Sequence, residues 1–406
     1  MNILTFSSLY PNSVRPSFGV FVETRLRHLV ASGEVESQVV APVPWFPLGH
    51  RRFGEWSALR QVPARERRAG LTVHHPRFVR LPKVGMSVAP LTMYLSLRPF
   101  IRRLLRQKAV DLIDAHYFYP DGVAAVMLGK EFELPVVITG RGTDLNLIPD
   151  YALPRRQIRW AAEQAAGLVT VCAALAEPLV RLGIPRDKVT VLRNGVDLSL
   201  FTPQDRGQIR AEMGLAGPVL LSVGWLIPRK GHHIAIDALS RLPGVTLLIA
   251  GSGPEGEALA ALARTLGVDN RVRFLGQVEQ QRLPSLYSAA DALLLASDRE
   301  GWANVLLEAM ACGTPVVASD VWGTAEAVTA PEAGRLFSPL DAPSLAAAIA
   351  RLLADPPARA ATRAYAEQFS WDETTRGQIE LFRNILSSRK GVTPAKAGVQ
   401  GSRKSR

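Results

Sequence analysis

The segment "SDREGWANVLLEAMACGTPVVASD" (residues 297–320) decides the fold class, because it combines a loop, an apolar helical stretch and a strand-like run. The apolar run "DALLLAS" (291–297) precedes it, and "TPVVASD" (314–320) closes it. Strand, helix and strand in this order are typical of a parallel sheet. Two glutamates, Glu300 in the loop and Glu308 in the first helical turn, lie within this otherwise apolar segment.

The same alternation extends over most of the chain, in two series joined near residues 197–210. The strand-like runs of the first series are "NILTFSS", "SQVVAP", "DLIDAHY", "PVVITG", "GLVTVC" and "KVTVLRNG". Those of the second are "PVLLSVGW", "VTLLIAGSG", "RVRFLGQV", "DALLLAS", "TPVVASD" and "AGRLFSP". Two such series predict an α/β protein of two Rossmann-like domains, with a ligand in the cleft where the carboxyl ends of both sheets face each other.

The series divide the chain into three parts. We expect an N-terminal acceptor domain over residues 1–198 and a C-terminal donor domain over 199–371. A helix over about 372–388 is expected to pack back on the first domain. Residues 389–406 are basic and have little to pack, which predicts a disordered tail.

The composition favours a globular protein in a reducing compartment. Hydrophobic residues make up 47% of the chain and charged residues 21%. The two cysteines, Cys172 and Cys312, match neither a disulfide framework nor a metal-ligand spacing. We expect no signal peptide, because a strand-like run begins at Asn2, and no membrane span, because no uncharged apolar stretch reaches 18 residues. The expected location is the cytoplasm.

The net charge of +12 is concentrated in the first half. Residues 1–198 carry 26 Lys and Arg against 16 Asp and Glu, whereas 199–388 carry 16 against 20. Basic surface attracts nucleic acid, anionic lipid and acidic ligands alike. The basic, aromatic-rich segment 43–106 is interpreted as a peripheral contact with an anionic membrane, or alternatively as a solvated arginine-rich loop. Its candidate docking residues are Trp45, Phe46, Arg51, Arg52, Arg67 and Arg68.

The start of the helix in segment 297–320 is suited to a phosphate. Asn304 is expected to cap a helix that begins near Val305. Free backbone N–H groups then gather at the positive end of the helix. They belong to Gly301, Trp302 and Ala303.

Acids and cations surround this helix end in the sequence pattern. Glu300 and Glu308 can each accept hydrogen bonds from hydroxyls that flank a phosphate, a sugar on one side and a ribose on the other. Arg229 and Lys230, in the turn of "VGWLIPRKG" (223–231), can neutralise a diphosphate leaving group. The alternatives are an ordinary loop acid, an acid favoured by a first helical turn, and a solvated basic turn.

The ordered motifs of the second half resemble the retaining glycosyltransferases of family 4. These motifs are "LRNGVDLSLFTP", "VGWLIPRKG", "IAGSGPEGEAL", "RVRFLGQV", "LYSAADALLLASDREGWANVLLEAMACGTPVVASD", "GTAEAV" and "FSWDETTRGQIELF". In the first half, "SSLYPNSVRPSFGVFVETRLRHL", "DAHYFYPDG" and "ITGRGTDLN" resemble a branch that makes cell-surface polysaccharides, including teichuronic-acid-type transferases.

This resemblance implies a fold and an activity. The fold would be GT-B, in which two facing Rossmann-like domains with parallel sheets enclose an interdomain cleft. The activity would be transfer of a sugar, with retained anomeric configuration, from a UDP- or GDP-sugar to a hydroxyl of a glycan or lipid-linked acceptor.

The resemblance also implies donor-side roles, residue by residue. Glu300 would bond hydroxyls of the donor sugar, and Glu308 the ribose. Lys230 and Arg229 would hold the diphosphate together with the N–H groups of the helix end. The backbone near Val278 would meet the base.

In the first domain, the resemblance implies roles at four positions. Gly19 would bring backbone close to the phosphates or the acceptor. His116 matches a histidine near the reacting carbon, although a buried histidine bonded to backbone is the alternative. Arg141 and Asp144 are expected on the acceptor side, or as a structural ion pair.

Trp225 departs from the family, which commonly has arginine there. The expected catalytic groups are His116, Lys230 and Glu300.

The sequence contains no metal-site pattern and leaves two other functions open. No histidine pair lies near an acid cluster and no Asp-x-Asp motif occurs, so a metal-independent enzyme without a cofactor is expected. A sugar-nucleotide epimerase or a phosphorylase would use the same fold. A non-catalytic binder of nucleic acid or of an anionic surface would use the basic first half, but no nucleic-acid module is recognisable.

Overall fold

Two parallel sheets organise the chain, and the computed structural model describes residues 1–45, 58–80 and 85–390. The first sheet has eight strands in the order β10-β9-β8-β7-β1-β2-β5-β4, all parallel except the pair β4 and β5. A separate parallel pair joins β3 and β6. The strands are β1 (Asn2–Phe6), β2 (Glu36–Val40), β3 (Val43–Trp45), β4 (Arg65–Arg68), β5 (Leu71–His74), β6 (Arg77–Val79), β7 (Leu112–His116), β8 (Val136–Gly140), β9 (Gly167–Thr170) and β10 (Val189–Val191).

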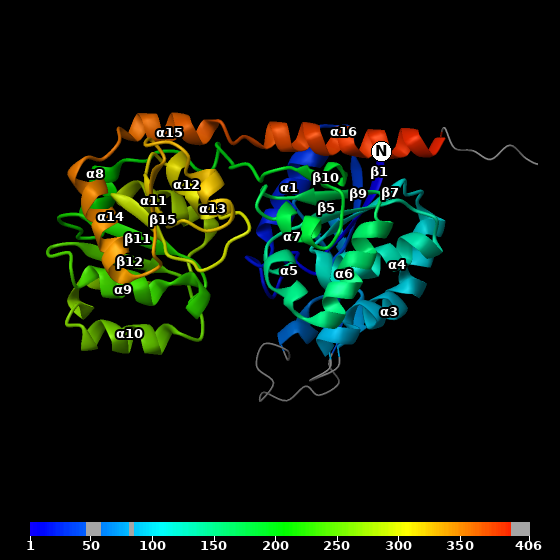
Figure 1. Cartoon of the computed structure of the whole chain (residues 1–406), viewed down its shortest axis with the longest axis horizontal. Coiled ribbons are helices and arrows are strands. Elements are labelled where there is room, and N and C mark those ends of the chain that lie inside the picture. Colours follow the sequence, from blue (N-terminus) through cyan, green and yellow to red (C-terminus); the bar gives the residue numbers. More distant parts are fainter. Residues whose placement is uncertain (46–57, 81–84, 391–406) are drawn as a thin grey trace, which may run out of the picture.

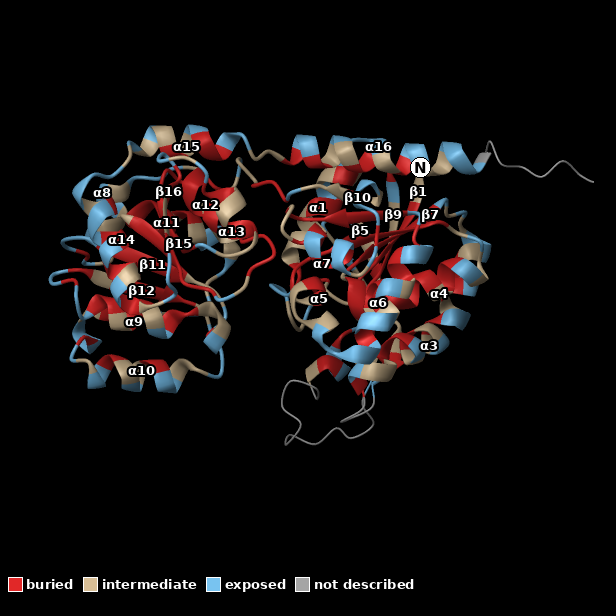
Figure 2. Cartoon of the chain, in the orientation of Figure 1, coloured by how far each residue is buried: buried red, intermediate tan, exposed pale blue. Residues whose placement is uncertain are grey.

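The second sheet has six parallel strands in the order β13-β12-β11-β14-β15-β16. They are β11 (Val219–Val223), β12 (Thr246–Ala250), β13 (Val272–Gly276), β14 (Ala292–Leu295), β15 (Val316–Ser319) and β16 (Gly334–Phe337). The strands are short apolar runs and their residues are mostly buried, as expected when helices cover both faces (Figure 2).

Helices cover both sheets and form two α/β units that lie side by side (Figure 1). The helices of the first unit are α1 (Val20–Ala31), α3 (Gly85–Gln107), α4 (Val123–Glu131), α5 (Thr143–Asn146), α6 (Ala152–Gln164) and α7 (Ala176–Arg181). The later helices of the chain are α8 (Arg206–Glu212), α9 (His232–Leu239), α10 (Gly256–Thr265), α11 (Leu283–Ala289), α12 (Asn304–Ala311), α13 (Gly323–Ala327), α14 (Ala342–Ala354), α15 (Arg359–Glu367) and α16 (Trp371–Lys390).

The strand order reverses at one point in each sheet, and these points place the site. β1 lies between β2 and β7, and β11 lies between β12 and β14. Ligands of such sheets bind outside the carboxyl ends of the strands at the reversal. The segments that begin at Ser7, Tyr117, Gly224 and Ala296 come directly after these strands, so they are expected to surround the ligand.

The last helix, α16, returns from the second unit and runs along the first (Figure 1). Ile379 and Phe382 of α16 are buried in one cluster with Leu26 and Leu29 of α1. The second half of the chain therefore supplies part of the first unit's core. The helix ends at Lys390, two residues beyond the expected boundary, and residues 391–406 of the expected tail lie outside the described part.

Over the three described ranges, every helix is too short or too polar to cross a membrane.

Candidate active site

The turn after β11 and the loop after β14 bring a cation beside a buried carboxylate. These strands are parallel neighbours, so the segments after them meet at one edge of the sheet. Lys230 Nζ donates to Glu300 Oε1 at 2.6 Å, and Arg229 Nη1 lies 3.7 Å from the same oxygen. Burial raises the pKa of Glu300, but the charge and hydrogen bond of Lys230 outweigh it and hold the pKa below its ordinary value. Glu300 is therefore an anion at neutral pH.

Glu308, one turn into α12, has a different environment. Its Oε2 accepts a hydrogen bond from the buried Tyr287 hydroxyl at 2.8 Å. It lines an interdomain cavity of about 920 Å³, together with Val278. Residues of α1 in the first domain line the same cavity, among them Phe21 and Thr24. Burial raises the pKa of Glu308 to about 7, so this acid titrates near neutrality.

We expect the free energy of unfolding to fall as pH rises from about 4.5 to about 7, in part because of Glu308. The pKa of Glu308 is 4.5 in the unfolded chain and about 7 in the folded protein. Between these two pH values the folded state therefore holds a proton that the unfolded state has lost. The stabilisation is present at low pH and is lost as pH rises through 7, by at most about 3 kcal/mol. Urea unfolding at several pH values checks this.

The matched variant for that prediction is Glu308→Gln, which cannot ionise. Asp121, whose pKa burial also raises to about 7, contributes a slope of the same sign in both proteins. The difference between wild type and Glu308→Gln therefore isolates Glu308. Identical pH profiles for the two proteins would contradict the prediction.

The backbone between the two glutamates presents hydrogen-bond donors. Within the described residues, the N–H groups of Gly301, Trp302 and Ala303 donate no hydrogen bond. Gly301 also packs against the first domain, because a Cβ there would lie 2.1 Å from the carbonyl oxygen of Arg141. Only glycine fits this approach, which brings the start of α12 to the domain interface.

The prediction that Asn304 caps α12 is wrong. The helix begins at Asn304, and Ala303 occupies the cap position without a side-chain hydrogen bond. Asn304 Oδ1 instead accepts from Asn194 Nδ2 at 3.2 Å, and the Asn194 carbonyl accepts from Trp302 Nε1 at 3.1 Å. Asn194 lies between β10 and the second domain, so the polar side chain of Asn304 ties this connection to α12 rather than capping the helix.

His116, at the end of β7, is buried with both ring nitrogens engaged. Nδ1 lies 2.6 Å from Arg141 Nη2, and Nε2 lies 3.2 Å from Asp114 Oδ2. Because a guanidinium only donates, Nδ1 accepts and the ring proton is on Nε2, facing Asp114. Burial lowers the pKa of His116, which keeps the ring neutral. Its position near a reacting carbon stays a prediction.

The polar cluster around His116 continues to α1 and α16. Gln378 of α16 donates through Nε2 to Asp114 Oδ2 at 2.9 Å and accepts from Arg25 Nε at 2.7 Å. Burial lowers the pKa of Arg25 to about 10 and that of Arg141 to about 9. Both guanidinium groups remain cations at neutral pH, and Asp114 is their buried counter-charge.

Arg141 and Asp144 do not pair with each other through their side chains. The Asp144 carboxylate accepts from the backbone N–H groups of Phe118 and Gly142, each at 2.7 Å, and of Arg141 at 3.0 Å. The Arg141 guanidinium donates instead to Asn194 Oδ1 at 3.0 Å and to His116. The two residues thus fix loops beside His116, and their expected contact with the acceptor stays a prediction.

Gly19 occupies a backbone position that other residues cannot adopt easily. Its φ is +73°, and a Cβ would lie 2.5 Å from the Leu9 carbonyl group. Gly19 thereby lets the start of α1 pack on the loop after β1. This places it at the carboxyl edge of the first sheet, while its contact with phosphate or acceptor remains a prediction.

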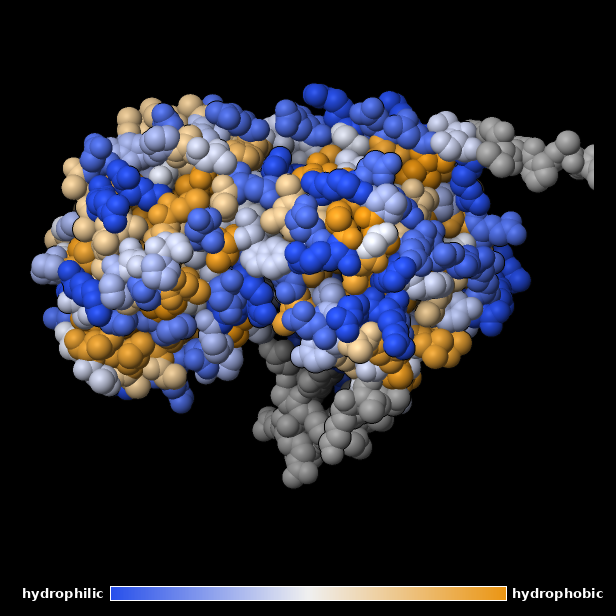
Figure 3. Space-filling model, in the orientation of Figure 1, coloured by the Kyte–Doolittle hydropathy of each residue, from blue (hydrophilic) through white to orange (hydrophobic). Residues whose placement is uncertain are grey.

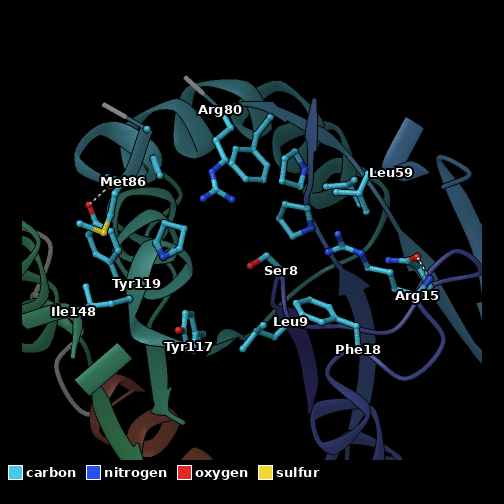
Figure 4. A pocket seen from close by; sticks show the side chains of 18 of the residues that line it. Ser8, Leu9, Arg15, Phe18, Leu59, Arg80, Met86, Tyr117, Tyr119 and Ile148 are labelled. Atoms are coloured by element: carbon cyan, nitrogen blue, oxygen red, sulfur yellow. Dashed lines mark hydrogen bonds between the residues drawn. The ribbon is translucent and has the colours of Figure 1, made fainter. Parts of the chain in front are cut away.

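A second cavity of about 490 Å³ lies mainly in the first domain (Figure 4). Tyr117, directly after His116 in the chain, and Trp225 of the second domain both line it. His232 fixes the loop of Trp225, because its Nε2 lies 3.2 Å from the Trp225 carbonyl oxygen. The departure from arginine at position 225 therefore places an aromatic ring in the wall of this cavity.

The structure groups the predicted residues into two sets. Lys230, Arg229 and Glu300 meet at the edge of the second sheet, while Val278, Asn304 and Glu308 line the larger cavity. Within the described ranges, no three His, Cys, Asp or Glu side chains gather where they could hold a metal ion.

Sequence reasoning missed Asp114, Asn194, Tyr287 and Gln378. Asp114 had a signal, since it lies two residues before His116 in a strand and so shares its face. Gln378 had none, because it is 264 residues from Asp114.

Comparisons with known proteins agree with this architecture. A family model of glycosyl transferases group 1 matches residues 205–369, and a model of glycosyltransferase family 4 matches 19–200. The sucrose-phosphate synthase structure from Thermosynechococcus elongatus covers 95% of this chain and 99% of its own, with a TM-score of 0.76 and 21% identity. The Anabaena HepE structure with UDP-glucose covers 96% and 99%, with a TM-score of 0.67 and 21% identity. The fold is the GT-B fold of glycosyltransferases, as the sequence predicted.

Sequence relatives narrow the class to a family. The chain is 34% identical over 369 residues to D-inositol 3-phosphate glycosyltransferase of Acidothermus cellulolyticus, covering 82% of this chain and 80% of the relative. It is 33% identical over 298 residues to glycogen synthase of Mycobacterium tuberculosis, covering 69% and 70%. The chain belongs to the family 4, group 1 glycosyltransferases. These relatives do not select the teichuronic-acid-type branch.

Proposed function

We propose that this glycosyltransferase moves a sugar, with retention of configuration and without a metal ion, from a UDP- or GDP-sugar to a hydroxyl of a glycan or lipid-linked acceptor. The acceptor belongs to cell-surface polysaccharide synthesis, and the enzyme works in the cytoplasm. One observation carries the proposal. Two glutamates, Glu300 with a lowered pKa and Glu308 with a raised pKa, flank backbone N–H groups that donate no hydrogen bond at the domain interface.

The donor role follows from the chemistry of this arrangement. A diphosphate needs N–H donors and cations, which the start of α12 and Lys230 supply. Glu308 and Val278 line a cavity of about 920 Å³, a size suited to a base and its ribose. The HepE structures with UDP and with UDP-glucose support a nucleotide sugar as donor.

Retention and metal independence rest on the family resemblance. In the front-face route that it implies, the leaving diphosphate takes the acceptor proton and no protein nucleophile is needed. Lys230 and the N–H groups of α12 would stabilise the charge that develops on the leaving phosphate.

The contact with a membrane is supported by the surface of α3. Leu91 and Leu95, four residues apart, are 46% and 55% exposed, and Trp45 is 47% exposed. Figure 3 shows apolar surface over α3 beside hydrophilic surface. Arg68 is not part of this surface, because it pairs with Glu23 at 3.0 Å and lines the larger cavity. Phe46, Arg51 and Arg52 lie outside the described residues.

A thermal-shift panel of nucleotide sugars tests the donor assignment. The correct donor should raise the midpoint by mass action, with about 2.7 kcal/mol of stabilisation at 100 times its Kd. Glu308→Ala should need about tenfold more donor for the same shift, because the ribose loses its partner. Silence of the wild-type protein across the panel would count against the proposal.

Product analysis separates the remaining candidates. An epimerase converts the donor with no acceptor present, and a phosphorylase needs inorganic phosphate. The proposed transferase releases nucleoside diphosphate only in step with a glycosylated acceptor. Binding of DNA or vesicles without binding of any nucleotide sugar would favour the non-catalytic binder.

A further inference from the structure

A carboxylate of the second domain, that of Glu326 in α13, is held by the first domain. Its Oε1 accepts from the backbone N–H of Ala174 at 2.8 Å, and its Oε2 accepts from that of Ala173 at 3.0 Å. Oε2 also accepts from Arg193 Nη2 at 2.7 Å and from Arg193 Nε at 3.2 Å. Ala173 and Ala174 follow β9 and Arg193 follows β10, so Glu326 joins the segments after two neighbouring strands. It is the acid of the motif "GTAEAV" (residues 323–328).

The guanidinium that Glu326 holds lies over the aromatic ring of Trp302. Arg193 Cζ is 5.9 Å from the centroid of this ring, within the range of a cation–π contact. The next residue, Asn194, accepts a hydrogen bond through its carbonyl oxygen from Trp302 Nε1 at 3.1 Å. Phe369 also packs on the ring, with the two centroids 6.0 Å apart. The buried Trp302 side chain is thus fixed at its face by Arg193 and at its edge by Asn194.

The backbone of Trp302 belongs to the segment that would bind the diphosphate. Its N–H lies between those of Gly301 and Ala303, just before α12. The helix of Glu326 also contacts this segment directly, because a Cβ at Gly323 would lie 2.0 Å from the Gly301 carbonyl oxygen. Hydrogen-bond donors that are held in place before a ligand arrives bind it more tightly than mobile ones. Fixing the ring of Trp302 therefore also restrains the N–H groups beside it.

We propose that Arg193 and Glu326 are positioning residues of the donor site. Glu326 holds Arg193 on the ring of Trp302, and the ring keeps the N–H groups of residues 301–303 directed at the diphosphate, so neither side chain has to touch the donor. The proposal rests on the proposed function, because these N–H groups bind a diphosphate only if the enzyme uses a nucleotide sugar. It also links donor binding to the domain arrangement, since both backbone donors of Glu326 come from the first domain.

Calorimetric titration of the full-length protein with UDP and GDP tests the proposal, with the affinity of the matching nucleoside measured by displacement of the bound diphosphate. Arg193→Gln and Glu326→Gln should each weaken the nucleoside diphosphate about fivefold, as expected for the loss of one charged contact behind the site. Each should change the affinity for uridine or guanosine less than about twofold, because a nucleoside carries no phosphate. Equal weakening of the nucleoside and the diphosphate would show a general structural role and overturn the proposal.

Arg98→Gln is the matched control for the loss of a positive charge. Arg98 lies on α3 of the first domain, and its Nε donates to Glu131 Oε1 at 2.6 Å. Its side chain is 44% exposed, against 45% for that of Arg193. We expect no change in the affinity for UDP or GDP. A loss as large as that in Arg193→Gln would show general charge attraction and contradict the positioning role.

A double variant tests whether Arg193 acts through Trp302. Trp302→Leu removes the ring, so adding Arg193→Gln to it should weaken the diphosphate no further. A second loss of about fivefold would mean that Arg193 acts on the ligand itself, and the proposal would be wrong. If urea unfolding shows that Trp302→Leu does not fold, Glu326→Gln combined with Arg193→Gln decides instead. That protein should bind the diphosphate as well as Arg193→Gln alone, and additive losses would overturn the proposal.

Two further results separate the positioning role from the proposed function. If the wild-type protein binds UDP or GDP and Arg193→Gln binds it equally well, the positioning role is wrong and the proposed function stands. If the wild-type protein binds neither diphosphate and no nucleotide sugar, the proposed function is the one that fails.

Discussion

Replacing Lys230 by alanine is expected to lower kcat of sugar transfer about 100- to 1,000-fold, with a smaller change in KM for the donor. In the proposed mechanism, Lys230 supplies the positive charge at the site where the leaving diphosphate becomes more negative. Its Nζ lies 2.6 Å from Glu300, so the substitution also leaves a buried carboxylate without its partner. Steady-state kinetics with the donor found by thermal shift measure the loss.

The double variant Lys230→Ala with Glu300→Gln separates these two effects. If the stranded carboxylate alone caused the loss, the neutral glutamine would restore turnover; we expect no restoration. Arg229→Gln is the matched control in the same turn, with its Nη1 3.7 Å from Glu300, and should cost less. Full activity of Lys230→Ala would contradict the assignment of Lys230 to the diphosphate of the donor.

Replacing Asp114 by leucine is expected to destabilise the protein by about 3–5 kcal/mol. Asp114 is buried and is the counter-charge of two buried guanidinium groups, those of Arg25 and Arg141. Its removal also frees Gln378 Nε2 and His116 Nε2 from their acceptor. Urea unfolding at pH 7 measures the change in the free energy of unfolding.

Two further proteins test the electrostatic cause. Asp111→Asn alters an acid just before β7 that accepts from the Asn2 backbone N–H at 2.7 Å, and it should cost about 1 kcal/mol. Adding Arg25→Met to Asp114→Leu should recover part of the lost stability, because one unpaired cation is removed. Wild-type stability of Asp114→Leu would show that the cluster is not held by charge.

Much of the fold was predictable because most strands of the two sheets are short apolar runs that local sequence reveals, whereas β4 is the charged run Arg65–Arg68 and was not predicted. The runs "PVVITG" and "DALLLAS" became β8 and β14, and their helical intervals became the covering helices. The Lys230–Glu300 contact could be expected for the same reason, since both residues come after strands that pair in the sheet. A pattern that places strands in one parallel sheet also places the loops at their carboxyl ends.

The rest depended on contacts that no local pattern encodes. Asn304 has a good capping side chain, yet a tertiary hydrogen bond from Asn194 takes its oxygen. The environment of His116 is completed by Gln378 through Asp114, from a helix at the other end of the chain. Such pairings arise from how the domains join, and a single sequence does not report that geometry.

The return of α16 to the first domain determines the order in which the parts of a newly made chain can complete their folding. Translation delivers the first domain early, yet Gln378, Ile379 and Phe382 emerge only after the whole second domain has been made. Until then Leu26 lacks its apolar cover and Arg25 its amide partner. Domains usually fold as they emerge, N-terminal first. Here the first domain reaches its final packing last. A ribosome that stalls before residue 371 therefore leaves a largely complete second domain beside a first domain that still lacks α16.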